Sequence, residues 1–332
     1  MLGPLLGVTL GLFPSCRRAE GPTEPGERST KNSEVASTAF WGGQKAQRQG
    51  SVTLAAVGDV LLDRGVSAQM RRRGDAHPFK EVRAVLRAYD LVFFNLECPL
   101  SRRGVARRTD VAFRGRPEHA KLLRWAGFSV ASLANNHTLD YGREALMDTV
   151  AAVEGAGITA VGAGKDMARA TRVRVVEVRG LRVGFLAYTD VPNAGTTILP
   201  QEPSVAGADL VDLRKKVAQV APKVDVLVVS FHWGVEYMKQ PTRRQEKLAQ
   251  TAIDAGAHLI LGHHPHVLQP LGSYRGRPIV YSAGGFVWDS RIRDSHESAI
   301  FTFRLARGRV TPLETIPVRI RLAQPRVVPK TP

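Results

Sequence analysis

Cysteine is almost absent from this chain, which contains only Cys16 and Cys98 among its 332 residues. No internal disulfide remains if Cys16 is removed or lipidated, and two thiols do not suffice for a cysteine-bound metal cluster. Cys98 directly follows Glu97, but a lone cysteine beside a buried strand is more often inert than nucleophilic. We therefore assign no function to sulfur chemistry.

Long hydrophobic runs are also scarce. The apolar stretch at residues 2–13 is shorter than the roughly 20 residues that a membrane-spanning helix needs. It matches the hydrophobic region of a signal peptide, and Phe13–Pro14–Ser15–Cys16 resembles a bacterial lipoprotein processing site, although no Lys or Arg precedes the run. We expect residues 1–16 to be a signal peptide, with lipidation of Cys16 left open. The mature protein would lie at the outer face of the cytoplasmic membrane or in the periplasm.

Acidic residues are too few to balance the basic ones. The chain has 30 Asp and Glu against 47 Lys and Arg, a formal net charge of +17. This excess attracts polyanions such as nucleic acid, anionic lipid or an acidic polymer. The basic residues are spread along the whole chain, and no helix-turn-helix, zinc-finger or RNP-like pattern accompanies them. We therefore expect no nucleic-acid partner.

The remaining composition indicates one large α/β domain. Residues 17–51 are polar and rich in Gly, Pro, Ser and Glu, as in a flexible linker, whereas 323–332 read as a loose Pro-rich tail. Between them, residues 52–322 alternate strand and helix patterns. Strands are predicted at 52–57, 90–94, 128–133, 172–179, 182–187, 224–231, 258–261, 279–282, 299–305 and 311–320. Helices are predicted at 68–73, 79–88, 117–126, 143–156, 210–220 and 242–255.

Five of the predicted strands end at a side chain suited to metal binding or acid–base chemistry. Loops at the carboxyl ends of neighbouring strands converge on one crevice in an open α/β sheet, so these residues are expected to form one composite site. Their carboxylates, amide oxygen and imidazoles favour one or two ions of manganese, iron or zinc. Such ions can deprotonate water and hold the oxygens of a phosphoryl or acyl group. The residues are Asp59, Glu97, Asn136 with His137, His232, and His264 with His266.

The residues, order and spacing of these motifs resemble those of the capsule synthesis protein CapA family over roughly residues 52–305. The resemblance rests on Gly58–Asp59–Val60–Leu61–Leu62, Asn95–Leu96–Glu97, Ala134–Asn135–Asn136–His137–Thr138–Leu139–Asp140–Tyr141–Gly142, His232–Trp233–Gly234–Val235–Glu236–Tyr237 and Gly262–His263–His264–Pro265–His266. That family is similar to the calcineurin-like metallophosphoesterases. The resemblance therefore implies a four-layer α/β/β/α sandwich and a link to poly-γ-glutamate capsule synthesis or export.

The resemblance also implies individual roles. Asp59 would ligate one metal, Glu97 would take the place of the bridging carboxylate, and Asn136 would offer its amide oxygen to a second metal. The imidazole ligands would be His232, His264 and His266. Alternate side chains share a face in an extended segment, so His263 is expected to point away from the site.

His137 would act as a general acid rather than as a ligand, because in the related phosphoesterases the histidine after the ligand asparagine has this role. Asp140, three residues later, could orient its imidazole. Asn135 is expected only to form loop hydrogen bonds. Two positions depart from the family pattern. Leu61 stands where an Asp-x-His signature would place a histidine, and Gly285 stands where the family usually has an asparagine.

Two hypotheses for the function remain open. The first is a metal-dependent hydrolase or transferase of the cell envelope that acts on a polyanionic or phosphorylated substrate, with Arg102, Arg103 and Glu236 contacting that substrate. The second is a non-catalytic accessory subunit that binds an acidic polymer such as poly-γ-glutamate for a membrane synthase or export complex. The converging ligands and the His137–Asp140 pair support the first, which we prefer, whereas the basic charge, the linker and the incomplete metal signature support the second.

Overall fold

The computed structural model describes residues 50–107, 111–193 and 199–329. The predicted signal peptide and nearly all of the predicted linker lie outside these residues. The helices are α1 (Arg64–Arg73), α2 (Arg83–Leu86), α3 (His119–Ala126), α4 (Gly142–Gly155), α5 (Met167–Ala170), α6 (Leu210–Val220) and α7 (Arg243–Asp254). Short 3-10 helices lie at η1 (His77–Phe79), η2 (Ala221–Lys223) and η3 (Arg293–His296).

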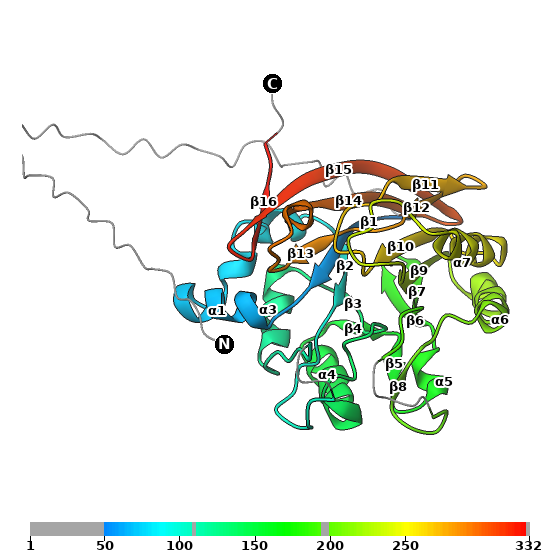
Figure 1. Cartoon of the computed structure of the whole chain (residues 1–332). Coiled ribbons are helices and arrows are strands. Elements are labelled where there is room, and N and C mark those ends of the chain that lie inside the picture. Colours follow the sequence, from blue (N-terminus) through cyan, green and yellow to red (C-terminus); the bar gives the residue numbers. More distant parts are fainter. Residues whose placement is uncertain (1–49, 108–110, 194–198, 330–332) are drawn as a thin grey trace, which may run out of the picture. The chain divides into compact units, whose positions relative to one another are not determined.

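Within the described residues the strands form two large sheets and one short pair (Figure 1). The first sheet has the order β16-β15-β14-β1-β2-β3-β4, with β13 also paired to β1, and the second has the order β11-β12-β10-β9-β7-β6. The strands of the first are β1 (Ser51–Val60), β2 (Leu91–Leu96), β3 (Val130–Ser132), β4 (Thr159–Val161), β13 (Gly285–Val287), β14 (Glu297–Ala306), β15 (Arg309–Arg321) and β16 (Gln324–Val327). Those of the second are β6 (Arg174–Val178), β7 (Leu181–Thr189), β9 (Val226–His232), β10 (Leu259–His263), β11 (Leu271–Tyr274) and β12 (Arg277–Val280). The short pair is β5 (Ala163–Gly164) with β8 (Ser204–Val205).

The buried side chains divide into layers that confirm the α/β/β/α sandwich. Along β1, Leu54 and Ala56 point into the core between the two sheets, whereas Ala55 and Val57 point into the core under the first layer of helices. This alternation follows from the two-residue period of a strand. A third core lies between the second sheet and α6 and α7. Figure 1 shows these two helices beside β9 and β10, with α1 and α3 beside the first sheet.

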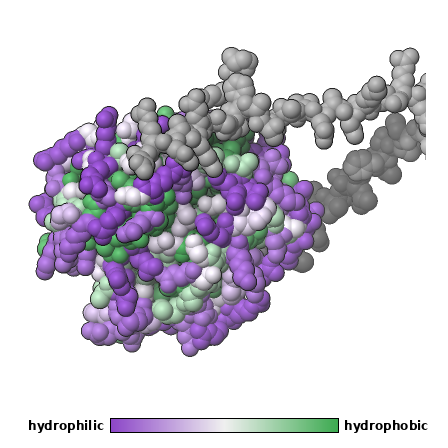
Figure 2. Space-filling view, turned by 180° about the vertical axis from the view of Figure 1, so that it is seen from behind, coloured by the Kyte–Doolittle hydropathy of each residue, from purple (hydrophilic) through white to green (hydrophobic). Residues whose placement is uncertain are grey.

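Both sheets contain a set of parallel strands, and the carboxyl ends of the two sets lie in the same region. In the first sheet β1, β2, β3 and β4 are parallel, and in the second β7, β9, β10 and β12 are parallel. Their carboxyl ends carry the polar motifs. Figure 2 shows one face of the molecule, where hydrophilic side chains are abundant and hydrophobic ones lie among them.

Two predicted boundaries are wrong. The predicted loose tail begins with the edge strand β16, which pairs with β15 and buries Gln324, whose amide donates to the His77 carbonyl oxygen at 2.6 Å. Pro325 is tolerated because β16 is at the edge of the sheet. The predicted helix at 79–88 is reduced to η1 and the four-residue α2, although Phe79, Val82 and Leu86 are buried as the helical pattern requires. The pattern therefore marked the buried face correctly but not the length of the helix.

Candidate metal centre

Residues at the ends of four parallel strands from both sheets meet in one buried cluster. Asp59 near the end of β1 is in register with Asn95 of β2, and His232 at the end of β9 is in register with His263 of β10. The backbone approaches closely here, because a Cβ on Gly58 would lie 1.9 Å from the carbonyl oxygen of Gly284. Only glycine fits before Asp59, which explains the Gly–Asp pair.

Two carboxylates lie at the centre of this cluster. Asp59 and Glu97 are both fully buried, and the Asn95 amide donates to Asp59 Oδ1 at 2.9 Å and to Glu97 Oε2 at 3.3 Å. Burial raises the pKa of Glu97 well above its ordinary value, and the charge of Asp59 raises it further. Burial would also raise the pKa of Asp59, but the neighbouring His263 and His266 outweigh it and lower that pKa well below the ordinary value.

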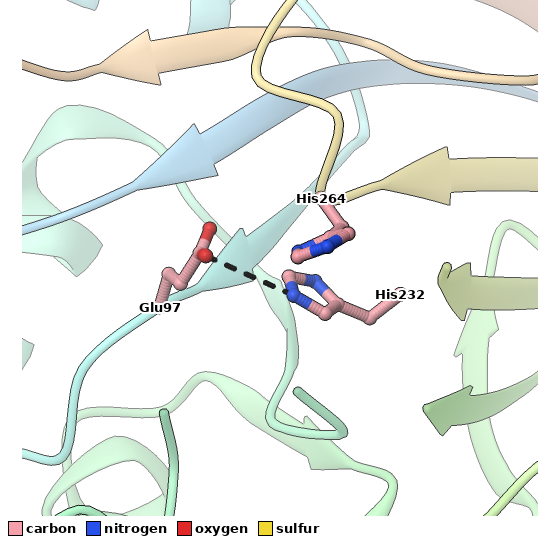
Figure 3. Close-up of side chains that lie close together, drawn as sticks. All are labelled: Glu97, His232 and His264. Carbon is pink, nitrogen blue, oxygen red and sulfur yellow. Dashed lines mark ion pairs between the residues drawn. The ribbon is translucent and has the colours of Figure 1, made fainter. Parts of the chain in front are cut away.

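Three of the predicted histidines surround the carboxylates. His266 Nδ1 lies 3.0 Å from Asp59 Oδ2, and its Nε2 lies 3.6 Å from Glu97 Oε1. His232 Nε2 lies 3.7 Å from the same Glu97 oxygen and 2.8 Å from the Asn136 amide oxygen. Figure 3 shows the imidazoles of His232 and His264 beside Glu97, with ring centres 4.7 Å apart. Burial lowers the pKa of His232 well below 6.5 and that of His264 to about 3.

The side chains fit a metal ion. In the described part of the chain, three groups each offer ligand atoms within 4.8 Å of one another. Buried polar atoms at the same place lack hydrogen-bond partners: Glu97 Oε1, both ring nitrogens of His263, and His264 Nδ1. Orphaned buried polar atoms cost free energy, and neutral imidazoles with carboxylates are donors that transition metals prefer. The three groups are Glu97–His232–His264, Glu236–His264–His266 and Asp59–Glu97–His266.

Glu236 lies at the solvent side of the cluster, and its contact with a substrate stays a prediction. It is exposed, but one of its oxygens lies within 4.8 Å of ligand atoms of His264 and His266. It could therefore complete a metal site at the solvent side as well as contact a substrate.

His137 and Asp140 form the predicted pair. His137 Nδ1 lies 2.8 Å from Asp140 Oδ2, and both side chains are almost wholly buried. The same carboxylate oxygen accepts the Phe113 backbone N–H at 2.8 Å, and the Phe113 ring packs 4.1 Å from the imidazole. Asp140 is thus fixed by two contacts, and the imidazole orientation is fixed with it.

Asn135 forms the loop hydrogen bonds that were predicted for it. Its side-chain oxygen accepts from the His137 backbone N–H at 3.1 Å and from Thr138 Oγ1 at 2.9 Å. Its amide donates to Asn95 Oδ1 at 3.0 Å. It therefore links the loop that carries His137 to the asparagine between the two carboxylates.

The orientation predicted for His263 is wrong. Its Nδ1 lies 3.5 Å from Asp59 Oδ1, and its ring packs against Phe93. Alternation fails because the segment is not extended: His264 has φ 97° and His266 has φ 57°. Such positive φ values are strained for residues other than glycine and are common at functional sites. His263 lies on the inner face of β10 with Leu259 and Leu261, and the two turns after it bring His264 and His266 toward the same carboxylates.

Three further residues at the site were missed from the sequence as functional positions. Asn95 bridges the carboxylates, and its place two residues before Glu97 on one strand face could have revealed it. Arg64, with φ 49°, holds its guanidinium 4.7 Å from the Phe113 ring and 5.3 Å from the Trp288 ring, and it pairs with Asp289. Trp288 stacks on His266 at 4.1 Å. No local signal points to Arg64 or Trp288, since their contacts are distant in sequence.

Arg102 and Arg103 do not contact the carboxylates or imidazoles of the cluster in any described interaction. Arg102 pairs with Glu118 at 2.8 Å, and Arg103 pairs with Asp148, with both arginines largely exposed. Each charge is partly neutralised where it lies. Their contact with a substrate stays a prediction.

The two departures from the family pattern have structural counterparts. Leu61 is fully buried in the core under the first helix layer and offers no ligand. At Gly285 a Cβ would lie 2.8 Å from Trp288 Cβ, so an asparagine there requires Trp288 to move. The indole that stacks on His266 therefore occupies space near the missing asparagine.

Solved structures share this fold. NAD nucleotidase from Haemophilus influenzae is similar in structure over 81% of this chain, with a TM-score of 0.53 and 10% sequence identity. The similar region spans about half (50%) of that protein. The calcineurin-like phosphoesterase YfkN from Bacillus subtilis is similar in structure over 83% of this chain and 92% of its own, with a TM-score of 0.50 and 15% sequence identity. These likenesses confirm the metallophosphoesterase type of fold.

Among the described residues, the helices are too short or too polar to cross a membrane.

Sequence relatives are closer. The capsule biosynthesis protein CapA of Bacillus anthracis is 34% identical over 292 residues, 86% of this chain and 71% of that protein. The PGA biosynthesis protein CapA of Bacillus subtilis is 33% identical over 82% of this chain and 73% of that protein. A probable polyglutamine synthesis accessory protein of Mycobacterium tuberculosis is 33% identical over 73% of this chain and 70% of that protein. A family model described as bacterial capsule synthesis protein PGA_cap matches residues 53–290. The chain therefore belongs to the bacterial capsule synthesis (PGA_cap) family.

Proposed function

We propose that this protein is a metal-dependent hydrolase or transferase that acts on a polyanionic or phosphorylated substrate during poly-γ-glutamate capsule synthesis. The observation that carries the proposal is the His137–Asp140 pair placed directly after Asn136, whose amide oxygen lies 2.8 Å from His232 within the cluster of candidate metal ligands. A proton donor beside a set of converging ligands is what acyl or phosphoryl transfer requires.

Each residue has a definable part in this chemistry. Asp59, Glu97, Asn136, His232, His264 and His266 would hold one or two ions of manganese, iron or zinc. A bound ion of this kind lowers the pKa of water and polarises a phosphoryl or acyl oxygen. Asp140 accepts a hydrogen bond from the Nδ1–H of His137 and so fixes the orientation of the imidazole. The opposite nitrogen, Nε2, is then left to deliver a proton to the oxygen or nitrogen of the leaving group.

A second candidate function is that of a non-catalytic accessory subunit that binds an acidic polymer. One relative is named a synthesis accessory protein, and the buried Leu61 removes one imidazole from the first metal position. Under this proposal the cluster would stabilise the fold or the complex rather than perform hydrolysis.

The experiment that separates the two uses His137→Ala in the full-length, metal-loaded protein, assayed on phosphomonoester, phosphodiester and γ-glutamyl amide substrates. Loss of positioned proton transfer should lower turnover by roughly 10²–10⁴-fold. Metal content should stay the same, because His137 is not assigned as a ligand.

His258→Gln is the matched control, because His258 precedes β10 and lies at the opposite end of that strand from His263. It should retain turnover. If the metal-loaded wild type turns over none of the substrates, or if His137→Ala is as active as wild type, the catalytic proposal fails and the accessory function remains.

A further inference from the structure

A cleft lies away from the metal centre, at the amino ends of β2 and β3. Its volume is about 470 Å³, and it is lined by Arg87 and Asp90 before β2 and by Lys121, Arg124 and Trp125 of α3. The metal ligands follow the carboxyl end of β2. That strand has six residues, so at about 3.3 Å per residue the two sites are roughly 20 Å apart. The cleft therefore does not belong to the metal centre.

The charges in this cleft are not balanced. Arg87, Lys121 and Arg124 are exposed, and within the described ranges none of them has an ion-pair partner. The one lining carboxylate, Asp90, is already satisfied by Arg179 at 2.7 Å and by two hydrogen bonds from Thr53. Among the described residues, the cleft is thus lined by three cations without an ion-pair partner and by one carboxylate that Arg179 already pairs.

Helix α3 supplies three of the side chains that line the cleft. Lys121 and Arg124 are three residues apart, and Lys121 and Trp125 are four apart, so they share one helix face with Cβ atoms about 5–6 Å apart. Trp125 is 39% exposed, and its ring is held by the Arg83 guanidinium at 4.5 Å. Two cations and an aromatic side chain of α3 therefore line the cleft together with Arg87.

We propose that this cleft binds a segment of an acidic polymer chain, independently of the metal centre; the identity of the polymer as poly-γ-glutamate rests on the proposed function. A volume of this size holds a small-molecule-sized segment. Exposed ion pairs are individually weak, so a single carboxylate gains little, whereas a chain with a carboxylate on every residue engages several cations at once. The site thus binds the polymer in preference to its monomer. It holds one segment of the polymer and leaves the other polymer residues outside the cleft.

The test measures binding of poly-γ-glutamate to the full-length protein and to the triple variant Arg87→Glu, Lys121→Glu, Arg124→Glu. The control variant is Arg214→Glu, Lys215→Glu, Lys223→Glu, which changes the net charge equally at exposed positions on and beside α6. The cleft variant should weaken binding at least about tenfold near physiological salt, and the control by less than about threefold. Equal weakening by both would overturn the proposal, because net charge alone would then explain binding.

Two further measurements locate the polymer and identify its class. In a Trp41→Phe background, bound polymer should change the tryptophan fluorescence, and Trp125→Phe should abolish that change, since the other two tryptophans, Trp233 and Trp288, are buried. Glutamate monomer and inorganic phosphate should compete only weakly. An oligothymidylate of equal charge that binds more tightly through the same three cations would overturn the assignment to an acidic peptide-like polymer.

Turnover and metal content are measured on the same cleft variant. The metal centre lies at the other end of β2, so both should match wild type. If no substrate is turned over by any protein but polymer binding depends on the cleft, the catalytic proposal fails while this inference stands.

Discussion

Replacing Glu97 by Gln should change stability in opposite directions with and without metal. Without metal, the Glu97 carboxylate is fully buried beside Asp59, and its Oε1 has no hydrogen-bond partner. A glutamine has the same shape and no charge. Its oxygen can keep the Asn95 hydrogen bond, while its amide nitrogen can donate toward His266 Nε2, which lies 3.6 Å from the present oxygen.

The expected increase in the free energy of unfolding follows from removing a buried polar group without a hydrogen-bond partner. Such a group usually costs about 1–3 kcal/mol. The free energy of unfolding of metal-free Glu97→Gln should therefore exceed that of wild type by about that amount. With metal at about 100 times its dissociation constant, wild type gains about 2.7 kcal/mol from binding. The variant has lost a charged ligand and should lose most of this gain, so wild type becomes the more stable protein.

The assay is denaturant unfolding of both proteins in chelator and in manganese, iron or zinc. Glu81→Gln makes the same chemical change at an exposed position and should shift the unfolding free energy by less than about 0.5 kcal/mol in either condition. If Glu97→Gln were destabilising in chelator and metal stabilised both proteins equally, Glu97 would be a structural residue and not a ligand.

Three other predictions concern separate parts of the molecule. His264→Ala should lower metal content more than His263→Ala, because His264 belongs to two of the ligand groups and His263 to none; equal losses measured by elemental analysis would refute this. Burial, aided by Arg116, lowers the pKa of His119 to about 4, so only the unfolded chain binds its proton between pH 6.5 and 4, and stability should fall as pH drops through that window. Denaturant unfolding at pH 7 and 5 should show a smaller fall for His119→Gln, and an identical fall would argue against the assignment. Cys16→Ala should release the protein from the membrane fraction if Cys16 is lipidated, and an uncleaved cytosolic chain would end the export prediction.

The strand-end motifs could be predicted from the sequence because each one is local. Asp59, Glu97 and His232 follow apolar runs, and topology then places parallel strand ends together. The order of the strands within each sheet needs distant pairing, such as that of β1 with β14, which no local pattern specifies. The edge strand β16 was missed for the same reason, because its pairing with β15 outweighs a polar, Pro-containing sequence.

Side-chain direction was the weakest part of the sequence interpretation. His263 ends β10 on the same face as Leu259 and Leu261, and the positive φ values of His264 and His266 break the alternation beyond it. The contacts of Arg64 with Phe113, Trp288 and Asp289 span residues far apart in the chain. They depend on the packing of α1 against the loops of the site, which the sequence alone does not reveal.

The central claim is that Asp59, Glu97, Asn136, His232, His264 and His266 hold a transition metal. It is tested most directly by anomalous diffraction from crystals of the full-length protein after reconstitution with manganese, iron and zinc. We predict one or two anomalous peaks among these six side chains, with matching stoichiometry by elemental analysis. No metal above background, or a peak bound elsewhere with these side chains in their present hydrogen bonds, would contradict the account.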